Sequence, residues 1–418
     1  MLSTLLSSKA ATSQDTRSTL AERFEAVRAR TRALAQPLSA EDQCVQSMPD
    51  ASPTKWHLAH TSWFFETVVL QAFQQGYQVF DPQYLYLFNS YYEALGPRHP
   101  RPQRGLLTRP ALAEIHVYRQ HINAAVLHFI RTAEPSVWSE AYSLIELGLQ
   151  HEQQHQELLQ TDVLHLMSCN PLLPAYLPVA AESNVGNGDA IPMQWLRVAG
   201  GIHSVGHAGS GFAFDNEMPQ HQTLLQPFHI ANRLVTCGEY LGFVADGGYA
   251  DARWWLSDGW AAIQNQGLHA PAYWLAPGDP RAPSSQWQEF GVYGLHAMDR
   301  QAPVRHVSFY EAAAFAEWYG ARLATEFEWE AAFDHPLITQ MLGQCWQWTR
   351  SSYDPYPGFR PRSGAVREYN GKFMVGQQVL RGSSVVTPDG HSRKTYRNFF
   401  PPAARWQFSG IRLAKDSV

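Results

Sequence analysis

The segment Leu144–Asp162, LIELGLQHEQQHQELLQTD, decides how the first half of this chain folds. It is a strongly helical run in which His151 and His155 stand four residues apart. Residues at i and i+4 lie on the same face of an α-helix, so both imidazoles can point at one metal ion. The run also carries an apolar stripe, formed by Leu144, Leu147, Leu158 and Leu159. The stripe predicts a helix packed in a bundle, with its histidines turned inward.

The same histidines allow two other interpretations. HEQQH matches the H-E-x-x-H pattern of zinc hydrolases, in which Glu152 would be the general base. Such an enzyme needs a third metal ligand on a neighbouring element. Alternatively, the two histidines are solvated or packed in the core and bind nothing. The motif alone leaves all three interpretations open.

Composition restricts the class of protein. The 418 residues are enough for two domains, and 45% hydrophobic against 17% charged residues describes a globular chain. A net charge of −5 without a long basic run argues against a nucleic-acid partner. Residues 1–19 lack the pattern of a signal peptide and are expected to be a disordered lead-in. No run approaches the roughly 20 apolar residues of a membrane span. Four scattered cysteines favour a reducing compartment, so we expect a cytoplasmic protein without a membrane partner.

Helical spacing of apolar residues predicts three further main helices, at 20–36, 54–74 and 110–133. Ser39 and Asp42 resemble a capping box that opens a short helix between the first two. Four main helices of this kind read as a bundle, a fold that builds metal sites from inward-facing side chains on different helices. His57 or His60 of the 54–74 helix would complete a three-histidine set. Such a set leaves coordination positions open for substrate and dioxygen.

The long connection 76–109 is too long to be a simple turn, and loops of this length are usually functional or disordered. It contains the adjacent Tyr91 and Tyr92 and three arginines at a spacing of three, Arg98, Arg101 and Arg104. The alternative is a well-packed surface loop with solvated arginines.

Residues 171–195 lose helical periodicity and gain Pro, Gly and Asn, which predicts a linker between a bundle at 17–170 and a second domain at 196–418. The second domain has a mixed α+β texture. Its motifs GGIHSVG, FDNEMPQHQ, PVRHVSFYEAAAFAEWYGARLATEFEWEAA, CWQWT and FSGIRLA resemble, in this order, the formylglycine-generating-enzyme-like domain, a C-type-lectin-related fold. Only Cys237 and Cys345 lie in this region, neither in a convincing position for the cysteine pair of that enzyme.

The two halves together resemble the ergothioneine-biosynthesis sulfoxide synthases, the EgtB family, which includes the related selenoneine synthases. The motifs that carry the resemblance are SPTKWHLAHTSWFFET, NSYYEALGPRHPRPQRG, HEQQHQE and TYRNFFPPAARWQFSGIRLA. The resemblance implies an α+β multidomain chain, in which a DinB-like four-helix bundle precedes the second domain. It also implies a non-haem iron(II) enzyme that uses dioxygen to join a sulfur or selenium donor to C2 of the imidazole of hercynine, a trimethylated betaine.

The resemblance assigns roles to individual residues. The iron ligands would be His60, His151 and His155. Tyr91 or Tyr92 would donate a proton, or a proton and an electron, to oxygen at the iron. Without this step the donor could simply be oxidised to a sulfinate. The residues implied in substrate binding are Gln154, Asn398, Phe399 and Phe400 for hercynine, and Arg101 with Arg98 or Arg104 for a donor carboxylate. Aromatic faces suit a trimethylammonium, and a guanidinium suits a carboxylate.

Three motifs depart from the family's W-E-W, G-E-Y-N and R-G-G-S, namely Trp346–Trp348, Arg367–Asn370 and Arg381–Ser384. They alter charges beside motifs of the C-terminal pocket and bear on the second substrate. The donor is therefore left open between cysteine or γ-glutamylcysteine and a selenosugar. Two other functions remain as alternatives, a zinc hydrolase and a lectin-like binding module with a vestigial bundle.

Overall fold

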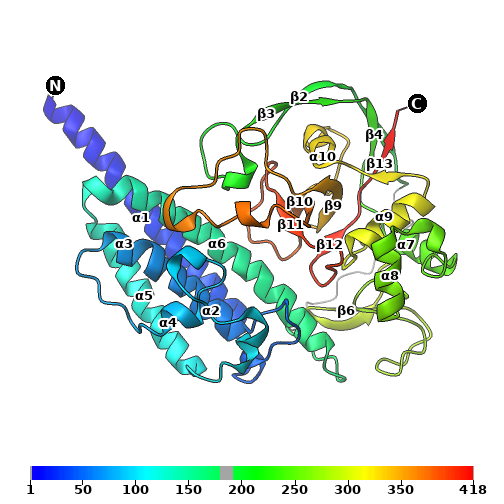
Figure 1. The fold of residues 1–418 in the computed structure, drawn as a ribbon, viewed down its shortest axis with the longest axis horizontal. Coiled ribbons are helices and arrows are strands. Elements are labelled where there is room, and N and C mark those ends of the chain that lie inside the picture. The colour runs from blue at the N-terminus through cyan, green and yellow to red at the C-terminus, as the bar shows by residue number, and fades with distance from the viewer. Residues whose placement is uncertain (1, 179–191, 418) are drawn as a thin grey trace. The chain divides into compact units, whose positions relative to one another are not determined.

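The computed structural model describes the backbone of residues 2–178 and 192–417, and side chains from residue 16 onward within these ranges except residue 365. The chain divides into two compact units, which are described separately (Figure 1). The first consists of Met1–Leu166 with Ser363–Val366, and the second of Met167–Arg362 with Arg367–Val418. Most of the predicted linker 171–195 lies outside the described residues. No helix within the described ranges is long and apolar enough to cross a membrane.

The N-terminal unit is helical. Its α-helices are α1 (Leu2–Ala35), α2 (Thr54–Phe64), α3 (Gln71–Phe73), α4 (Tyr84–Leu87), α5 (Leu112–Thr132) and α6 (Pro135–Ser168). Helix α1 includes most of the segment that was expected to be disordered. The sequence offers a reason, because residues 2–35 contain neither glycine nor proline to interrupt a helix.

The helix predicted at 54–74 contains a π-helical segment. Helix α2 continues through η2 (Phe65–Leu70), in which the hydrogen bonds have π spacing, into α3. Such segments are frequent at functional sites. The capping box predicted at Ser39 and Asp42 is present, with reciprocal bonds of 2.9 and 3.1 Å, but it opens only the short 3₁₀ turn Asp42–Cys44.

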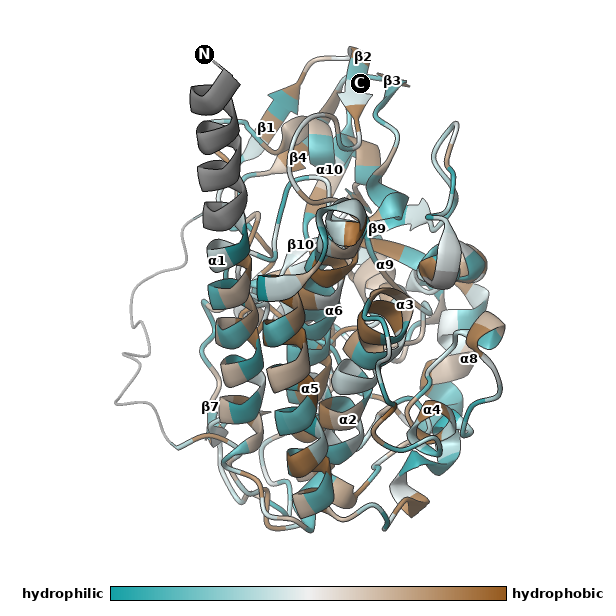
Figure 2. Ribbon diagram, turned by 90° about the vertical axis from the view of Figure 1, so that its left-hand side faces the viewer, coloured by the Kyte–Doolittle hydropathy of each residue, from teal (hydrophilic) through white to brown (hydrophobic). Residues whose placement is uncertain are grey.

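The core of this unit lies between the long helices. Side chains such as Phe24 of α1, Leu58 of α2 and Ile122 of α5 are fully buried. Figure 2 shows hydrophobic and hydrophilic residues interspersed along the helices, as expected when each helix buries one stripe. The connection 76–109 holds α4 and two 3₁₀ turns, Glu93–Leu95 and Arg101–Leu106.

The C-terminal unit is a mixed α+β structure, and its described residues form four small sheets. Their strand orders are β1-β4-β13-β8, β11-β10-β9-β12, β2-β3 and β5-β6-β7. The pairings are antiparallel except that of β12 with β9. The strands are β1 (Trp195–Val198), β2 (Gly201–Val205), β3 (His221–Leu225), β4 (Phe228–Ala231), β5 (Trp274–Leu275), β6 (Gln288–Gly291), β7 (Gly294–Ala297), β8 (Arg322–Leu323), β9 (Cys345–Ser352), β10 (Gln378–Ser383), β11 (Asn398–Phe400), β12 (Ser409–Gly410) and β13 (Leu413–Asp416).

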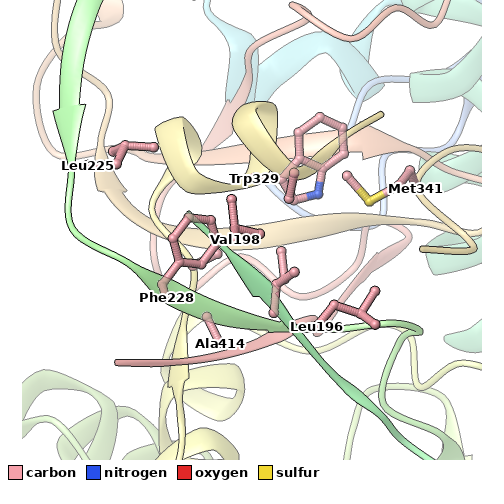
Figure 3. Packing of buried hydrophobic residues seen from close by; sticks show 10 residues of the cluster. Leu196, Val198, Leu225, Phe228, Trp329, Met341 and Ala414 are labelled. Carbon is pink, nitrogen blue, oxygen red and sulfur yellow. The ribbon is translucent and has the colours of Figure 1, made fainter. Parts of the chain in front are cut away.

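In the part of this unit that the structure describes, the α-helices are α7 (Cys237–Ala245), α8 (Ser257–Gln266), α9 (Phe309–Trp318) and α10 (Glu326–Ala332). A hydrophobic cluster joins α10 to the first sheet. Trp329 of α10 packs with Val198 of β1, Phe228 of β4 and Ala414 of β13, and Figure 3 shows these side chains gathered together. Antiparallel pairing of β13 with β4 brings Ala414 into this core.

Candidate metal centre

Helices α2 and α6 bring three histidines to one point inside the N-terminal unit. His60 comes from α2, and His151 and His155 come from successive turns of α6. The Nε2 atom of His151 lies 3.2 Å from that of His60 and 3.1 Å from that of His155. All three potential ligand atoms lie within 4.8 Å of one another, and the three side chains are buried. We call these residues the histidine cluster.

A backbone carbonyl fixes the orientation of His60. Its Nδ1 lies 2.6 Å from the carbonyl oxygen of Phe88, which can only accept a hydrogen bond. Nδ1 therefore carries the proton, and Nε2 of the neutral ring presents its lone pair to the other two histidines. A ligand histidine whose second nitrogen donates to a carbonyl is common in protein metal sites.

A chain of side chains fixes the orientation of His155. Its Nδ1 lies 2.8 Å from Nδ1 of His57, and Nε2 of His57 lies 3.1 Å from Oδ2 of Asp162. The same carboxylate oxygen accepts the backbone N–H of Ser52 at 2.8 Å. His57 is thus not a member of the histidine cluster but lies directly behind one.

Burial keeps the cluster neutral. It lowers the pKa of His60 and His155 well below the usual value, with His151 adding to the effect on both, and it lowers the pKa of His151 to about 3. Neutral imidazole is the form that binds a metal.

These observations fit a bound cation. His60 and His155 both present lone pairs toward His151 at about hydrogen-bond distance. One proton on Nε2 of His151 could serve only one of these two neighbours, whereas a metal ion would serve all three nitrogens. Three histidine ligands on two helices also leave coordination positions for other ligands, as catalytic centres require.

Aromatic rings enclose His60 on both faces. Trp56 stacks on it at 4.5 Å between ring centroids and 13° between planes, and Trp63 stacks on it at 5.5 Å and 17°. The guanidinium of Arg104 lies 3.4 Å from the centroid of Trp56 and donates to Ser52 Oγ at 2.9 Å. Burial is the main cause that lowers the pKa of Arg104. The site is therefore dry on this side and lies near a buried cation.

The three arginines of the connection differ in position. Arg104 is buried, whereas Arg98 pairs with Glu93 at 2.7 Å and is more than a third exposed. Arg101 is exposed and donates to the backbone carbonyl of Asp50. A spacing of three along a loop gave no basis for choosing among them. In the N-terminal unit it is Arg104 that packs beside the histidine cluster.

The two tyrosines lie at the end of the aromatic stack. Tyr92 is fully buried, 5.6 Å from Trp63 between ring centroids, and Tyr91 stacks on Tyr92 at 4.7 Å and 27°. Tyr91 is only half-buried. Gln154 is also half-buried and directly precedes His155 on α6. These three predicted site residues belong to the same unit as the cluster.

The three predicted hercynine residues near the C-terminus form β11. Successive side chains of a strand point to opposite faces, so Asn398 and Phe400 share one face and Phe399 takes the other. Phe399 stacks on Tyr353 at 4.1 Å and 11°, while Phe400 meets Trp406 edge-on at 6.0 Å. The two rings therefore leave β11 on opposite faces, and their contact with the trimethylammonium of hercynine stays a prediction.

Glu152 has a structural environment unlike that of a general base. Arg28 and Arg119 donate to its two carboxylate oxygens at 2.8 and 2.9 Å, and Thr31 donates at 2.6 Å. Burial raises the pKa of Glu152, but the two guanidinium groups outweigh it and bring the pKa to about 2. A general base needs a pKa near the working pH and access to water, so the zinc-hydrolase alternative loses its essential residue.

The departures from the family's motifs are also located in the structure. Gln347 is buried, with Oε1 accepting from Trp329 and Arg412 at 2.7 Å each, and Nε2 donating to the carbonyl of Met341 at 2.9 Å. Ser383 and Ser384 are buried as well, whereas Arg367 is exposed. The loss of charge at Gln347 thus lies in the core of the C-terminal unit, and its place relative to a donor pocket stays a prediction.

Comparison with known proteins covers both units. Residues 23–159 match the DinB superfamily, and residues 187–335 and 338–417 match the sulfatase-modifying factor enzyme 1-like domain. The hercynine oxygenase of Mycobacterium tuberculosis is 32% identical to this chain, over 93% of this chain and 96% of that protein. The hercynine oxygenase of Mycolicibacterium smegmatis is 29% identical over 96% of this chain and 99% of that protein. Ergothioneine biosynthesis protein 1 of Schizosaccharomyces pombe is 25% identical over 49% of this chain and 28% of that protein.

Proposed function

The chain belongs to the hercynine oxygenase family, and we propose that it uses iron(II) and dioxygen to join a sulfur or selenium donor to C2 of the imidazole of hercynine. The product would be a precursor of ergothioneine or selenoneine. The observation that carries the proposal is the histidine cluster of three neutral imidazoles, in which Nε2 of His151 lies 3.2 Å from that of His60 and 3.1 Å from that of His155.

The proposed ligands are His60, His151 and His155. Iron(II) held there would supply the binding and activation of dioxygen beside the donor. Neutral histidines suit this metal and leave room for a thiolate or selenolate. The protein's own contribution is to orient the ligands, through the Phe88 carbonyl and through His57, and to exclude water with Trp56 and Trp63.

Tyr92 or Tyr91 is proposed to donate a proton during carbon–sulfur or carbon–selenium bond formation. Support comes from the stack that joins His60, Trp63, Tyr92 and Tyr91 in one unit. We expect Tyr92→Phe to shift the product from the hercynine adduct toward oxidised donor, a sulfinate where the donor is a thiol. Product masses measured with Tyr91→Phe alongside would show which hydroxyl matters.

The donor is proposed to be cysteine, γ-glutamylcysteine or a selenosugar. Cysteine-type donors carry a carboxylate that an arginine can bind, and Arg98, Arg101 and Arg104 are the candidates. A sugar would not need this contact. Gln154, Asn398, Phe399 and Phe400 are proposed to contact hercynine, each as a separate prediction.

The decisive experiment uses protein loaded with iron(II) under anaerobic conditions. It is mixed with hercynine and air-saturated buffer, and separately with each of the three donors, and products are identified by mass. Hercynine-dependent oxygen uptake with an adduct from at least one donor supports the proposal. A protein that binds iron but consumes no oxygen with hercynine and any of these donors contradicts it. His165→Ala is a matched control, because His165 lies on α6 outside the cluster and bonds to Ser47 at 2.7 Å.

A further inference from the structure

Behind the histidine cluster, Asp162, His57 and His155 form a continuous hydrogen-bonded chain. The links measure 3.1 Å from Asp162 Oδ2 to His57 Nε2, and 2.8 Å from His57 Nδ1 to His155 Nδ1. The three side chains are at least nine-tenths buried, so water does not compete for these bonds. We call this set the relay.

The direction of the hydrogen bonds in the relay follows from its outer end. Oδ2 of Asp162 accepts the backbone N–H of Ser52, and Nε2 of His57 donates to the same oxygen. With its proton on Nε2, the ring of His57 accepts at Nδ1, and His155 donates to it through Nδ1. The lone pair of His155 is left on Nε2, the atom that lies 3.1 Å from Nε2 of His151.

The relay is supported from both helices. His155 and Asp162 are seven residues apart on α6, which places them two turns apart on the same face. His57 of α2 lies between them. Asp162 Oδ2 also accepts the backbone N–H of Ser52, a residue just before α2. The hydroxyl of Ser52 in turn accepts a hydrogen bond from Arg104. The carboxylate is thus held by groups that do not depend on a metal.

The other anchored ligand is oriented differently. His60 donates to a backbone carbonyl, which no side-chain substitution can remove. His155 depends entirely on side chains, so its orientation can be changed without altering any ligand. This difference makes the role of the relay testable.

Given the metal centre proposed above, we propose that His57 and Asp162 are positioning residues that fix the tautomer and direction of His155. His57 transmits the acceptor strength of the carboxylate to the ligand. In its absence Nδ1 of His155 loses its acceptor, and the ring is free to present either nitrogen to the cluster. Partners of this kind typically change metal affinity by about 10- to 100-fold.

The competing explanation is that the relay only joins α2 to α6. That role would change the stability of the metal-free protein and leave metal affinity untouched once the protein is folded. The test therefore measures both quantities on the same full-length variants.

Two substitutions separate geometry from charge. His57→Phe keeps an aromatic ring and removes both nitrogens. Asp162→Asn can keep an oxygen at the position of Oδ2, where both recorded bonds end, and removes only the charge. Tyr118→Phe is the matched control, since it removes one buried hydrogen bond, to Glu66 at 2.6 Å, elsewhere in the same unit.

Cobalt(II) affinity is measured by competition with a chromophoric chelator, and unfolding of the metal-free forms by circular dichroism. We expect His57→Phe to weaken cobalt(II) binding by about 10- to 100-fold, and Asp162→Asn by less, while Tyr118→Phe binds like the wild type. The proton NMR spectrum of the cobalt(II) protein should also lose one shifted exchangeable signal in His57→Phe, that of Nδ1–H of His155.

Wild-type affinity in both His57→Phe and Asp162→Asn would overturn the proposal, whatever their stability. If His57→Phe does not fold, Asp162→Asn decides alone, because its affinity either falls or does not. Failure of the proposed function looks different. In that case the wild-type protein itself would bind metal without forming a hercynine adduct, or bind no metal at all.

Discussion

The two units bury polar side chains in opposite ways. In the C-terminal unit Glu326 and Glu330 lie among Arg381 and Arg397, all nearly inaccessible, and every contact joins opposite charges. In the histidine cluster of the N-terminal unit three groups of the same kind converge, neutral and without a counter-charge among them. In the first arrangement each carboxylate is paired with a guanidinium, whereas in the second the imidazoles present lone pairs to a common point. Buried polar groups therefore indicate a functional site only where they leave lone pairs that a ligand or metal ion can bind.

The same contrast occurs between neighbours on α6. His151 faces the other histidines, while Glu152 points to Arg28 and Arg119. Adjacent residues of a helix face directions about 100° apart. One turn of α6 can therefore carry a proposed metal ligand, His151, and a residue that stabilises the fold, Glu152. Four substitutions test whether the two kinds of buried site differ in this way.

The largest effect is expected from His151→Ala, which removes the nitrogen nearest to both other ligands. Metal content and formation of the hercynine adduct should fall below detection, because two remaining imidazoles form an incomplete site. Elemental analysis and product mass check this, with His165→Ala retaining both. A variant that keeps iron at the wild-type level would show that the cluster is not the iron site.

Arg381→Leu should instead affect stability alone. It leaves Glu326 and Glu330 without one of their buried partners, a change that costs about 3–5 kcal/mol. Denaturant unfolding measures the loss, and iron affinity of the folded fraction should stay the same. Weaker iron binding at full folding would mean that the two kinds of site are coupled.

Glu152→Gln should reduce stability in a pH-dependent way. The pKa of Glu152 is about 2 in the folded protein against 4.5 for an ordinary glutamate, so its ionised form favours the folded state. A shift of this size corresponds to about 3 kcal/mol, present above pH 4.5 and lost as the pH falls toward 2. Unfolding curves of wild type and variant should therefore converge in acid. Parallel curves across this range would contradict the assignment.

The smallest effect is expected from Gln347→Glu, which restores the family's acidic residue. The substitution replaces the Nε2 donor, which bonds to the carbonyls of Met341 and Gln340, with an oxygen that can only accept. We expect this to lower the free energy of unfolding by about 1–3 kcal/mol, and the nearby guanidinium of Arg412 to offset part of the loss. Relative rates with cysteine, γ-glutamylcysteine and a selenosugar should not change. A change of donor preference would mean that this buried position acts on the donor after all.

Several features of the molecule could be predicted from sequence. The i, i+4 histidines placed α6 and its inward face, and apolar spacing located α5 and the helix that begins at Thr54 within a few residues. Helix α1 ends at Ala35, close to its predicted end, but it begins at Leu2 and not near residue 20. The division into a helical and a mixed unit followed from the change of texture near residue 170. The alternation of side chains along a strand also places Phe399 on the opposite face of β11 from Asn398 and Phe400.

Other features had no local signal. The carbonyl of Phe88 accepts from His60, a ligand 28 residues earlier in the chain. The side chain of Asp162 acts on His155, seven residues earlier, but only through His57 of another helix. Arg28 and Glu152 pair across 124 residues. Such contacts depend on how helices pack, and no periodicity in a single segment reports them.

The π-helical segment Phe65–Leu70 lies immediately after the turn that carries His60. A π turn holds one residue more than the corresponding α turn, so shortening this stretch by a single residue could be absorbed as an ordinary helix. The helix on both sides of the deletion, His57 and His60 included on one side, would then keep its rotation about the axis. Removing a residue from an ordinary α turn would instead rotate the chain beyond it by about 100°. The π turn is thus a place where this helix can lose one residue without turning its metal-facing side.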